Sequence, residues 1–292
     1  MKSIFVFGLF EDSPGKTTFS RGLLHSLNEA GLKPAPLKAR AGHNYWYQYD
    51  MLQPCLRQGR LYCSDIIKLR EASGIDEPYE VLNPIDTLIT PLDSRYYLEN
   101  ENSRSLYLAN NDLFNHFSME RHTKVEDDKI NNTILLRETP MHLVPEKTLE
   151  KFYRTDDEVI KIENLENWSH FYERNANESI TSCTNYLETQ NYDVLVSEGF
   201  CDIIYHAPRI EHDVVIGVSP GYTVKYPPKR FSKAIKYKSR EGKTQFKASE
   251  IISYIKPEKI NKISPLTSAE LKDLEKVSEA YSETINSIMN QI

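Results

Sequence analysis

The stretch VFGLFEDSPGKTTFS, residues 6–20, decides the expected fold. It joins an apolar run that ends at Gly8, typical of a buried parallel strand, to residues 17–30, whose apolar side chains recur with helical spacing. A second short strand is expected at 36–39, so the chain begins as strand, helix and strand. This alternation predicts an α/β fold, with a mostly parallel central sheet and helices on both of its faces.

The same alternation continues along the 292 residues. We expect further strands at 133–137, 192–197, 213–218 and 260–263, and helices over most of 45–69, over 163–189 and over 268–292. Residues 93–128 are polar and weakly periodic, unlike the rest. We therefore predict a single domain spanning 1–292, with an insertion or subdomain at about 93–132.

Composition narrows the class of protein and its partners. Hydrophobic residues make up 39% of the chain and charged residues 27%, as in soluble globular proteins, and the net charge of −6 disfavours a nucleic-acid or anionic-membrane partner. Basic residues gather at 225–247, which we interpret as a solvated helix face with its neighbouring loop rather than a nucleic-acid surface. Four scattered cysteines are typical of reduced thiols, and the N-terminal apolar run is too short for a signal or a membrane span. We expect a cytoplasmic protein.

A glycine, a lysine and two threonines follow the first strand where the helix begins. Backbone N–H groups at a helix N-terminus bind phosphate, a lysine can reach the β and γ phosphates, and a threonine hydroxyl can hold Mg²⁺. The usual phosphate-binding loop has a glycine five residues before Gly15, where this chain has Phe10. The alternative is an ordinary surface helix that Ser13 caps and Pro14 begins. We predict nucleotide contacts from Ser13, Pro14, Gly15, Lys16, Thr17 and Thr18.

Two charged residues at strand ends extend this predicted site. Lys38 lies at the C-terminal end of the second strand, at the sheet edge where α/β proteins bind ligands, and would guide a phosphoryl group or a substrate carboxylate. Glu198 follows the strand 192–197, where a carboxylate can hold Mg²⁺ or orient water. A surface lysine and a charged strand terminus are the ordinary alternatives. We predict that Lys16, Lys38 and Glu198 are the catalytic residues.

Further carboxylates are candidate ligands for Mg²⁺. Glu11 and Asp12 would repel phosphates unless a metal lies between, so each is either a metal ligand or part of an exposed, charged turn. The segment GHNYWYQYD, residues 42–50, is rich in aromatics, which form either core or the wall of a pocket. In the second case His43 would supply a polar contact and Asp50 would complete the Mg²⁺ shell. The candidate metal ligands are therefore Thr17, Glu11, Asp12, Asp50 and Glu198.

Three segments resemble the dethiobiotin synthetase-like branch of P-loop NTPases: FGLFEDSPGKTTF (7–19), LKARAGHNYWYQYD (37–50) and YDVLVSEGFCD (192–202). The second segment makes the chain more similar to the archaeal family described as predicted P-loop ATPase/GTPase proteins. LNPIDTL (82–88) also resembles the Asn-Pro loop of that branch. The resemblance implies a three-layer P-loop sandwich that binds Mg²⁺ and nucleotide, with phosphate contacts from the GKTT segment. It also implies phosphorylation of a carbamate or carboxylate.

The chain departs from this branch in ways that limit what is carried over. Dethiobiotin synthetase has Glu-Gly-Ala-Gly-Gly where this chain has EGFCD, residues 198–202, so biotin synthesis is not transferred. The related partition ATPases have a lysine where this chain has Glu11, which disfavours their nucleotide-sandwich dimer and leaves another kind of homodimer open. NKIS at 261–264 lacks the aspartate that would read guanine, so ATP is favoured over GTP.

We therefore expect a Mg²⁺-dependent P-loop ATPase that activates a small carboxylated metabolite of unknown identity by phosphoryl transfer. One alternative is a nucleotide-dependent regulatory switch that hydrolyses slowly and acts on a protein partner. A further alternative is a degenerate loop that binds no nucleotide.

Overall fold

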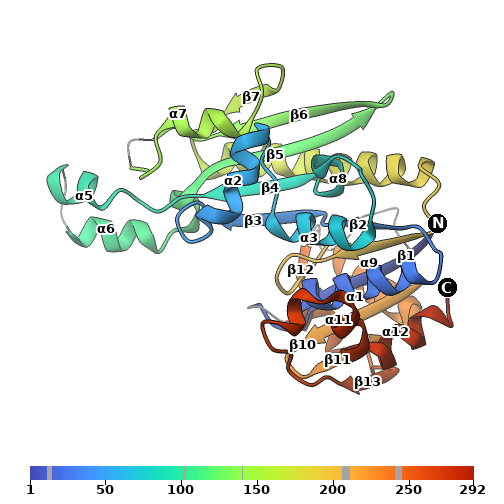
Figure 1. Cartoon of the computed structure of the whole chain (residues 1–292). Coiled ribbons are helices and arrows are strands. Elements are labelled where there is room, and N and C mark those ends of the chain that lie inside the picture. The colour runs from blue at the N-terminus through green and yellow to red at the C-terminus, as the bar shows by residue number, and fades with distance from the viewer. Residues whose placement is uncertain (12–14, 101–102, 140, 206–210, 241–244) are drawn as a thin grey trace. The chain divides into compact units, whose positions relative to one another are not determined.

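The computed structural model describes residues 1–11, 15–100, 103–139, 141–205, 211–240 and 245–292, without the side chain of Tyr205 (Figure 1). Its contacts divide the chain into two compact units. The first unit comprises Met1–Ala39, Asp65–Pro78 and Thr184–Ile292, and the second Arg40–Ser64 and Tyr79–Cys183. The expected insertion at 93–132 lies inside the second unit. Each unit contains a mixed sheet with helices, which confirms the α/β class.

The sheet of the first unit has six strands in the order β13-β11-β10-β1-β8-β2. Strands β2, β8, β1 and β10 are parallel, and β11 and β13 extend the sheet antiparallel. Their bounds are β1 Lys2–Gly8, β2 Pro34–Leu37, β8 Val194–Glu198, β10 Val214–Ser219, β11 Tyr222–Tyr226 and β13 Lys259–Lys262. The short strands β9 (Ile203–Tyr205) and β12 (Gln245–Lys247) form a separate pair. The strands predicted from apolar runs are therefore present.

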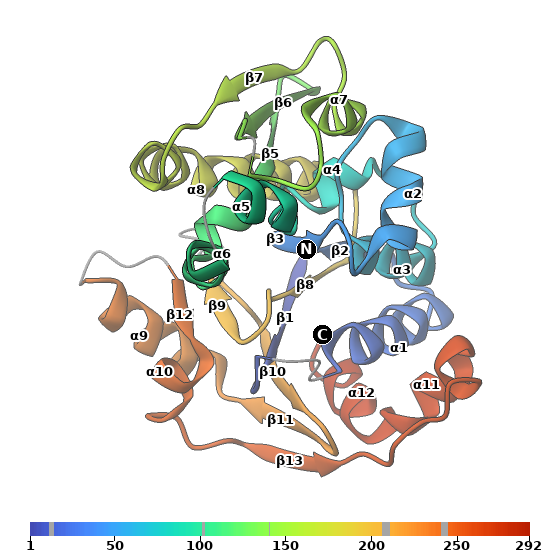
Figure 2. The ribbon, with the colours of Figure 1, turned by 90° about the vertical axis from the view of Figure 1, so that its left-hand side faces the viewer.

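Helices cover both faces of this sheet (Figure 2). One face is covered by α1, which contacts β1, β2, β8 and β10, and α12 packs beside it. The other face is covered by α9, which contacts β10 and pairs with α10. The helical elements of the unit are α1 Lys16–Glu29, α3 Ser64–Ser73, α9 Pro228–Ser239, α10 Ala248–Ile252, η3 Glu270–Lys272, α11 Leu274–Ala280 and α12 Ser282–Met289.

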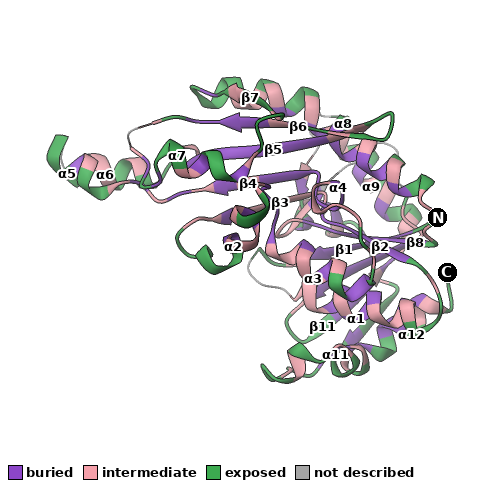
Figure 3. Ribbon diagram, turned by 45° about the horizontal axis from the view of Figure 1, so that its top comes forward, coloured by how far each residue is buried: buried purple, intermediate pink, exposed green. Residues whose placement is uncertain are grey.

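Strand β1 carries the core of this unit because its side chains alternate between the two faces. Phe5 and Phe7 join the cluster under α9, where both rings lie within about 6 Å of Phe231 between centroids. Ile4 and Val6 point the other way and are fully buried. β1 and β8 are thus buried along almost their whole length (Figure 3). Such continuous burial explains the apolar runs at 4–7 of β1 and 194–196 of β8.

The C-terminal segment forms two short helices rather than one continuous helix over 268–292. Asp273 accepts hydrogen bonds from the backbone N–H groups of Glu275 and Lys276, and so begins α11 as an N-cap. α11 packs closely on α1 at Gly22, where an added Cβ would lie 2.9 Å from Val277 Cγ1. The prediction of one continuous helix was wrong. It relied on the apolar spacing, which continues unchanged across the cap at Asp273 and the helix boundary at Tyr281.

The second unit is built on a five-stranded sheet in the order β3-β4-β5-β6-β7. β3 and β4 are parallel, β5 is antiparallel to both β4 and β6, and β7 pairs parallel with β6. The strands are β3 Arg40–Asn44, β4 Ile85–Ile89, β5 Phe117–Glu126, β6 Lys129–Leu136 and β7 Glu158–Lys161. The helical elements are α2 Tyr49–Gln58, α4 Tyr79–Leu82, α5 Ser94–Asn100, α6 Ser103–Asn110, η1 Leu113–His116, α7 Glu146–Leu149, η2 Glu150–Phe152 and α8 Leu165–Thr189. None of the helices in the described part of the chain is long and apolar enough to cross a membrane.

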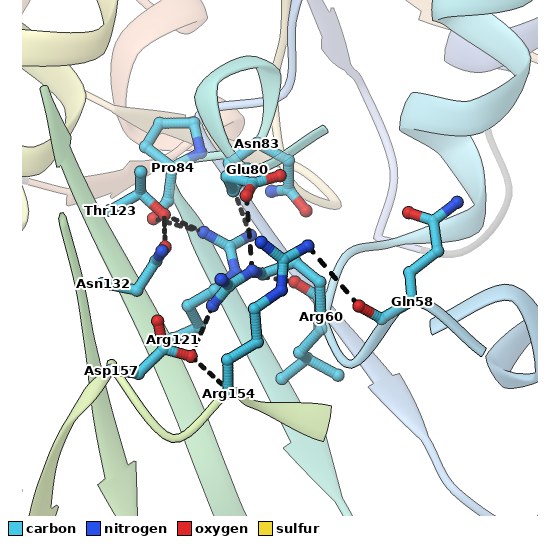
Figure 4. Close-up of polar contacts among 11 residues, drawn as sticks. Gln58, Arg60, Glu80, Asn83, Pro84, Arg121, Thr123, Asn132, Arg154 and Asp157 are labelled. Carbon is cyan, nitrogen blue, oxygen red and sulfur yellow. Dashed lines mark hydrogen bonds and ion pairs between the residues drawn. The ribbon is translucent and has the colours of Figure 1, made fainter. Parts of the chain in front are cut away.

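Buried charged groups organise the second unit, most of all Arg121 on β5. Its guanidinium is fully buried and donates to the backbone oxygens of Leu61 at 2.6 Å, Asn83 at 2.6 Å and Pro84 at 3.4 Å (Figure 4). It also donates to the hydroxyl of Thr123. One side chain therefore holds two loops that are far apart in sequence against the same strand.

His142 makes the stability of the second unit depend on pH. Its Nε2–H donates to the backbone oxygen of Asn115 at 2.7 Å, and burial lowers the pKa of this imidazole to about 4. An unfolded histidine titrates near pH 6.5, so below that pH protons bind the unfolded chain first and stability falls until pH 4. As the pH falls from 7.5 to 5, we expect the titration of His142 to lower the free energy of unfolding by about 2 kcal/mol.

This loss is measurable by urea unfolding followed by tryptophan fluorescence, because both tryptophans, Trp46 and Trp168, lie in the second unit. The control is His142→Gln, which keeps a donor for Asn115 and cannot titrate. The difference between the two proteins isolates His142 from the other histidines. An equal loss of stability in both would contradict the prediction.

Candidate phosphate and cation site of the first unit

The candidate site lies where parallel strands end and α1 begins. Gly15 precedes α1 with φ of 93°, a left-handed conformation that a side chain would strain. In the register of the sheet, Val6 pairs with Glu198, and Leu37 pairs with Ser197. Lys38 therefore emerges beside Glu198, and both lie at the same sheet edge as the end of β1. The sheet itself brings together groups that are 160 positions apart in the chain.

Lys16 is the first residue of α1, and its side chain is buried. Its ammonium group donates a hydrogen bond to the backbone oxygen of Cys201, at 2.7 Å. Burial lowers the pKa of Lys16, and the nearby charge of Lys38 lowers it further. The environment thus disfavours a second positive charge, and an anion would relieve this cost.

Glu198 is the centre of the site. Its Oε1 accepts a hydrogen bond from the Thr17 hydroxyl at 2.9 Å and lies 2.5 Å from the Lys38 ammonium nitrogen. The side chains of Glu198 and Lys38 are almost fully buried. The second carboxylate oxygen, Oε2, is buried and has no hydrogen-bond partner among the described residues. A buried carboxylate oxygen in this state is a ready ligand for a cation.

Asp65 is a site residue that sequence reasoning missed. It lies in the first turn of α3, and its Oδ2 is 3.0 Å from the Lys38 ammonium nitrogen. Burial raises the pKa of this carboxyl, but the charge and hydrogen bond of Lys38 outweigh burial, and the net pKa is below its usual value. The side chain keeps 35% of its surface exposed, so the ionised carboxylate can contact a ligand.

The remaining predicted residues are placed as follows. Thr18 is in the first turn of α1, whereas Asp12, Ser13 and Pro14 lie outside the described residues. Glu11 is exposed, and its Oε2 lies 3.8 Å from the Lys247 ammonium nitrogen. Asp50 is exposed in the first turn of α2, in the second unit.

The aromatic segment of the second unit does not form its core. Trp46 and Tyr47 are 61% and 82% exposed, and their backbone N–H groups donate to Asn44 Oδ1 in a tight turn. His43, in contrast, is buried, with its Nε2 3.5 Å from Asp86 Oδ2. His43 therefore points to an acidic partner inside the unit.

The arrangement combines the N-terminus of α1, two ammonium groups, a hydroxyl and two carboxylates. In the described ranges, no cluster of three or more His, Cys, Asp and Glu residues is placed to hold a metal ion. The acidic ligands that the site offers a cation are Glu198 and Asp65, with the hydroxyl of Thr17. Two lysines balance two carboxylates, so an incoming anion and cation would together keep the site neutral.

Comparison with known proteins adds no relative to this description. No protein-family model matches the chain, and no curated protein matches it.

Proposed function

We propose that the first unit binds Mg-ATP at the N-terminus of α1 and transfers a phosphoryl group to a small carboxylated metabolite. One observation carries the proposal: the Thr17 hydroxyl and the Lys38 ammonium converge on one oxygen of Glu198, while its other oxygen is buried without a partner among the described residues. A threonine and a carboxylate that meet behind a phosphate-binding turn are the ligands that phosphoryl-transfer sites provide for Mg²⁺.

The residues present fit a magnesium ion. Thr17 and Glu198 would hold it directly, and Asp65 offers a third oxygen ligand close to the Lys38 ammonium. When bound, the metal neutralises charge on the β and γ phosphates. In this proposal, Asp65 serves as the additional metal ligand for which the sequence suggested Asp50, Glu11 or Asp12.

The two lysines have separate tasks. Lys16, at the start of α1, would leave the backbone oxygen of Cys201 and donate to the β and γ phosphates. Lys38 is held between Glu198 and Asp65, so its ammonium is positioned before any ligand arrives. There it would orient the acceptor carboxylate and stabilise the charge on the transferred group, which requires no reorganisation during the reaction.

Calorimetric titration with Mg-ATP and with Mg-GTP tests the nucleotide. The proposal expects binding of ATP, tighter than binding of GTP, followed by hydrolysis that a carboxylated metabolite accelerates. Slow hydrolysis that metabolites do not change, together with a nucleotide-dependent change in protease sensitivity, would favour the regulatory switch. Absence of binding for both nucleotides would overturn the proposal.

Glu198→Gln tests the role of the carboxylate. The amide keeps the size of the side chain but loses the charge that attracts the metal, so ATP hydrolysis should fall about 100-fold. The requirement for Mg²⁺ should rise at the same time. Steady-state hydrolysis measured over a series of Mg²⁺ concentrations gives both numbers.

Glu29→Gln is the matched control, because Glu29 is an exposed carboxylate at the other end of α1. It should hydrolyse ATP as the unmodified protein does. An unchanged Mg²⁺ dependence in Glu198→Gln, with its fold verified by circular dichroism, would remove Glu198 from the metal site.

A further inference from the structure

A second candidate site lies on the opposite face of the first sheet, between α9 and the end of α10. It is an open groove of about 670 Å³, within the size range of ligand pockets. In Figure 2, α9 and α10 lie beside each other, on the other side of the sheet from α1. The groove is lined by Arg230, Lys233, Ala234, Tyr237, Lys238, Tyr254 and Ile255.

The groove is positively charged without internal compensation. Arg230, Lys233 and Tyr237 recur at spacings of three and four residues, so they share one stripe of α9. Neither Arg230, Lys233 nor Lys238 makes an ion pair with another residue in the described ranges. Like charges at this spacing on a helix repel one another. An anion in the groove would remove that repulsion.

Two tyrosine rings flank these cations. Tyr237, on α9, is 68% exposed, and Tyr254, in the turn after α10, is 76% exposed. Ile255, which is buried, and Ala234 provide an apolar floor between them. Exposed aromatic faces beside basic side chains are the combination with which proteins bind nucleotides, because the rings stack on bases while the cations contact phosphates.

We propose that this groove binds nucleotide units, with Arg230, Lys233 and Lys238 on phosphate and Tyr237 and Tyr254 against the base. The observations favour a nucleotide over an acidic peptide. The carboxylates of a peptide would pair with the basic side chains but would give the two tyrosine rings no base to stack against. A nucleotide unit can come from a free mononucleotide or from a single strand. The proposal is independent of the site at Lys16, which lies across the sheet.

The concentrated charge revises the expectation from composition. The whole chain has a net charge of −6, which disfavours nucleic acid only if charge is spread evenly. α9 instead carries five basic residues and no acidic one: Lys229, Arg230, Lys233, Lys236 and Lys238. A local basic surface can bind phosphate on a protein that is acidic overall.

The experiment measures binding of a fluorescently labelled RNA of about ten uridines by anisotropy, in the Lys16→Ala background so that the other site does not contribute. Uridine monophosphate is tested as a competitor, and inorganic polyphosphate serves as a polyanion without rings. Contacts from three cations to a single strand predict a log–log salt slope of about −2.

Arg230→Glu combined with Lys233→Glu should weaken RNA binding at least about tenfold and flatten the salt slope. Tyr237→Leu, which removes the ring and keeps an apolar side chain, should weaken it about tenfold as well. Lys272→Glu reverses one charge at an exposed lysine outside the groove and should bind RNA normally.

The outcomes are separable. Competition by uridine monophosphate at its own micromolar affinity supports a free nucleotide as the source, and preference for the RNA supports a single strand. Polyphosphate binding as tight as RNA, with no effect of Tyr237→Leu, overturns the proposal in favour of a charged surface alone. RNA binding that is absent, or that is equal in the groove variants and Lys272→Glu, overturns it entirely.

Discussion

Lys16→Ala should reduce ATP hydrolysis by about 100- to 1,000-fold, the range found when a single transition-state donor is removed. The ammonium group of Lys16 is the only side-chain cation in the described first turn of α1, and it already lies inside the site, donating to Cys201. Alanine removes the charge that would neutralise the β and γ phosphates, and no neighbouring group can replace it: Lys38 is held by Glu198 and Asp65.

Steady-state hydrolysis and calorimetric titration measure this effect together. Lys33→Ala is the control, since Lys33 is an exposed lysine of the same unit. The fold of Lys16→Ala should be retained, because the variant loses one hydrogen bond and is relieved of a buried charge. Equal turnover in Lys16→Ala and the unmodified protein would refute the mechanism, and loss of binding alone would leave the regulatory switch in place.

Arg121→Leu should destabilise the second unit by about 4 kcal/mol. Buried ion pairs can often be replaced by apolar residues at little cost, but the partners of Arg121 are mainly backbone oxygens, which no substitution removes. Leucine would leave the oxygens of Leu61 and Asn83 buried without the guanidinium donor, whereas Pro84 keeps the backbone N–H of Thr123. The two loops that carry them would then lose their attachment to β5.

Urea unfolding followed by tryptophan fluorescence reports this loss, because both tryptophans lie in the affected unit. Arg95→Leu is the matched control: Arg95 belongs to the same unit, is largely exposed and, among the residues that the structure describes, pairs only with Glu99 of its own helix. We expect it to change stability by less than about 0.5 kcal/mol. If Arg121→Leu unfolds at the same urea concentration as Arg95→Leu, the network does not stabilise the unit.

The sequence predicts the first unit far better than the second, for a physical reason. β1, β8 and β10 are apolar because helices cover both of their faces, so their sequences show burial directly. β5 instead buries Glu120, Arg121, His122 and Thr123 in succession. Such a segment has the polarity of an exposed loop, and only partners distant in sequence, such as Leu61 and Asn83, allow its burial.

The sequence could predict only those residues of the candidate site that lie at the ends of recognisable strands. Lys38 and Glu198 were identified because each lies at the C-terminal end of a strand whose apolar run is clear. Asp65 was missed because it lies 27 positions from Lys38 in an ordinary helical turn, where no local pattern distinguishes it. The oxygen of Cys201 that accepts from Lys16 belongs to the backbone, so residue type carries no signal for it.

The pairing of β1 has a consequence for the order in which the chain can fold during synthesis. Its neighbours are β8 and β10. The backbone N–H of Ser3 donates a hydrogen bond to the carboxylate of Asp213, 210 positions further along the chain. A nascent β1 therefore leaves the ribosome with no strand to pair with. All of the second unit, which ends at Cys183, has been synthesised before β8 appears. The unit that contains β1 is thus closed after the second unit has been synthesised, and its apolar strand stays unpaired until then.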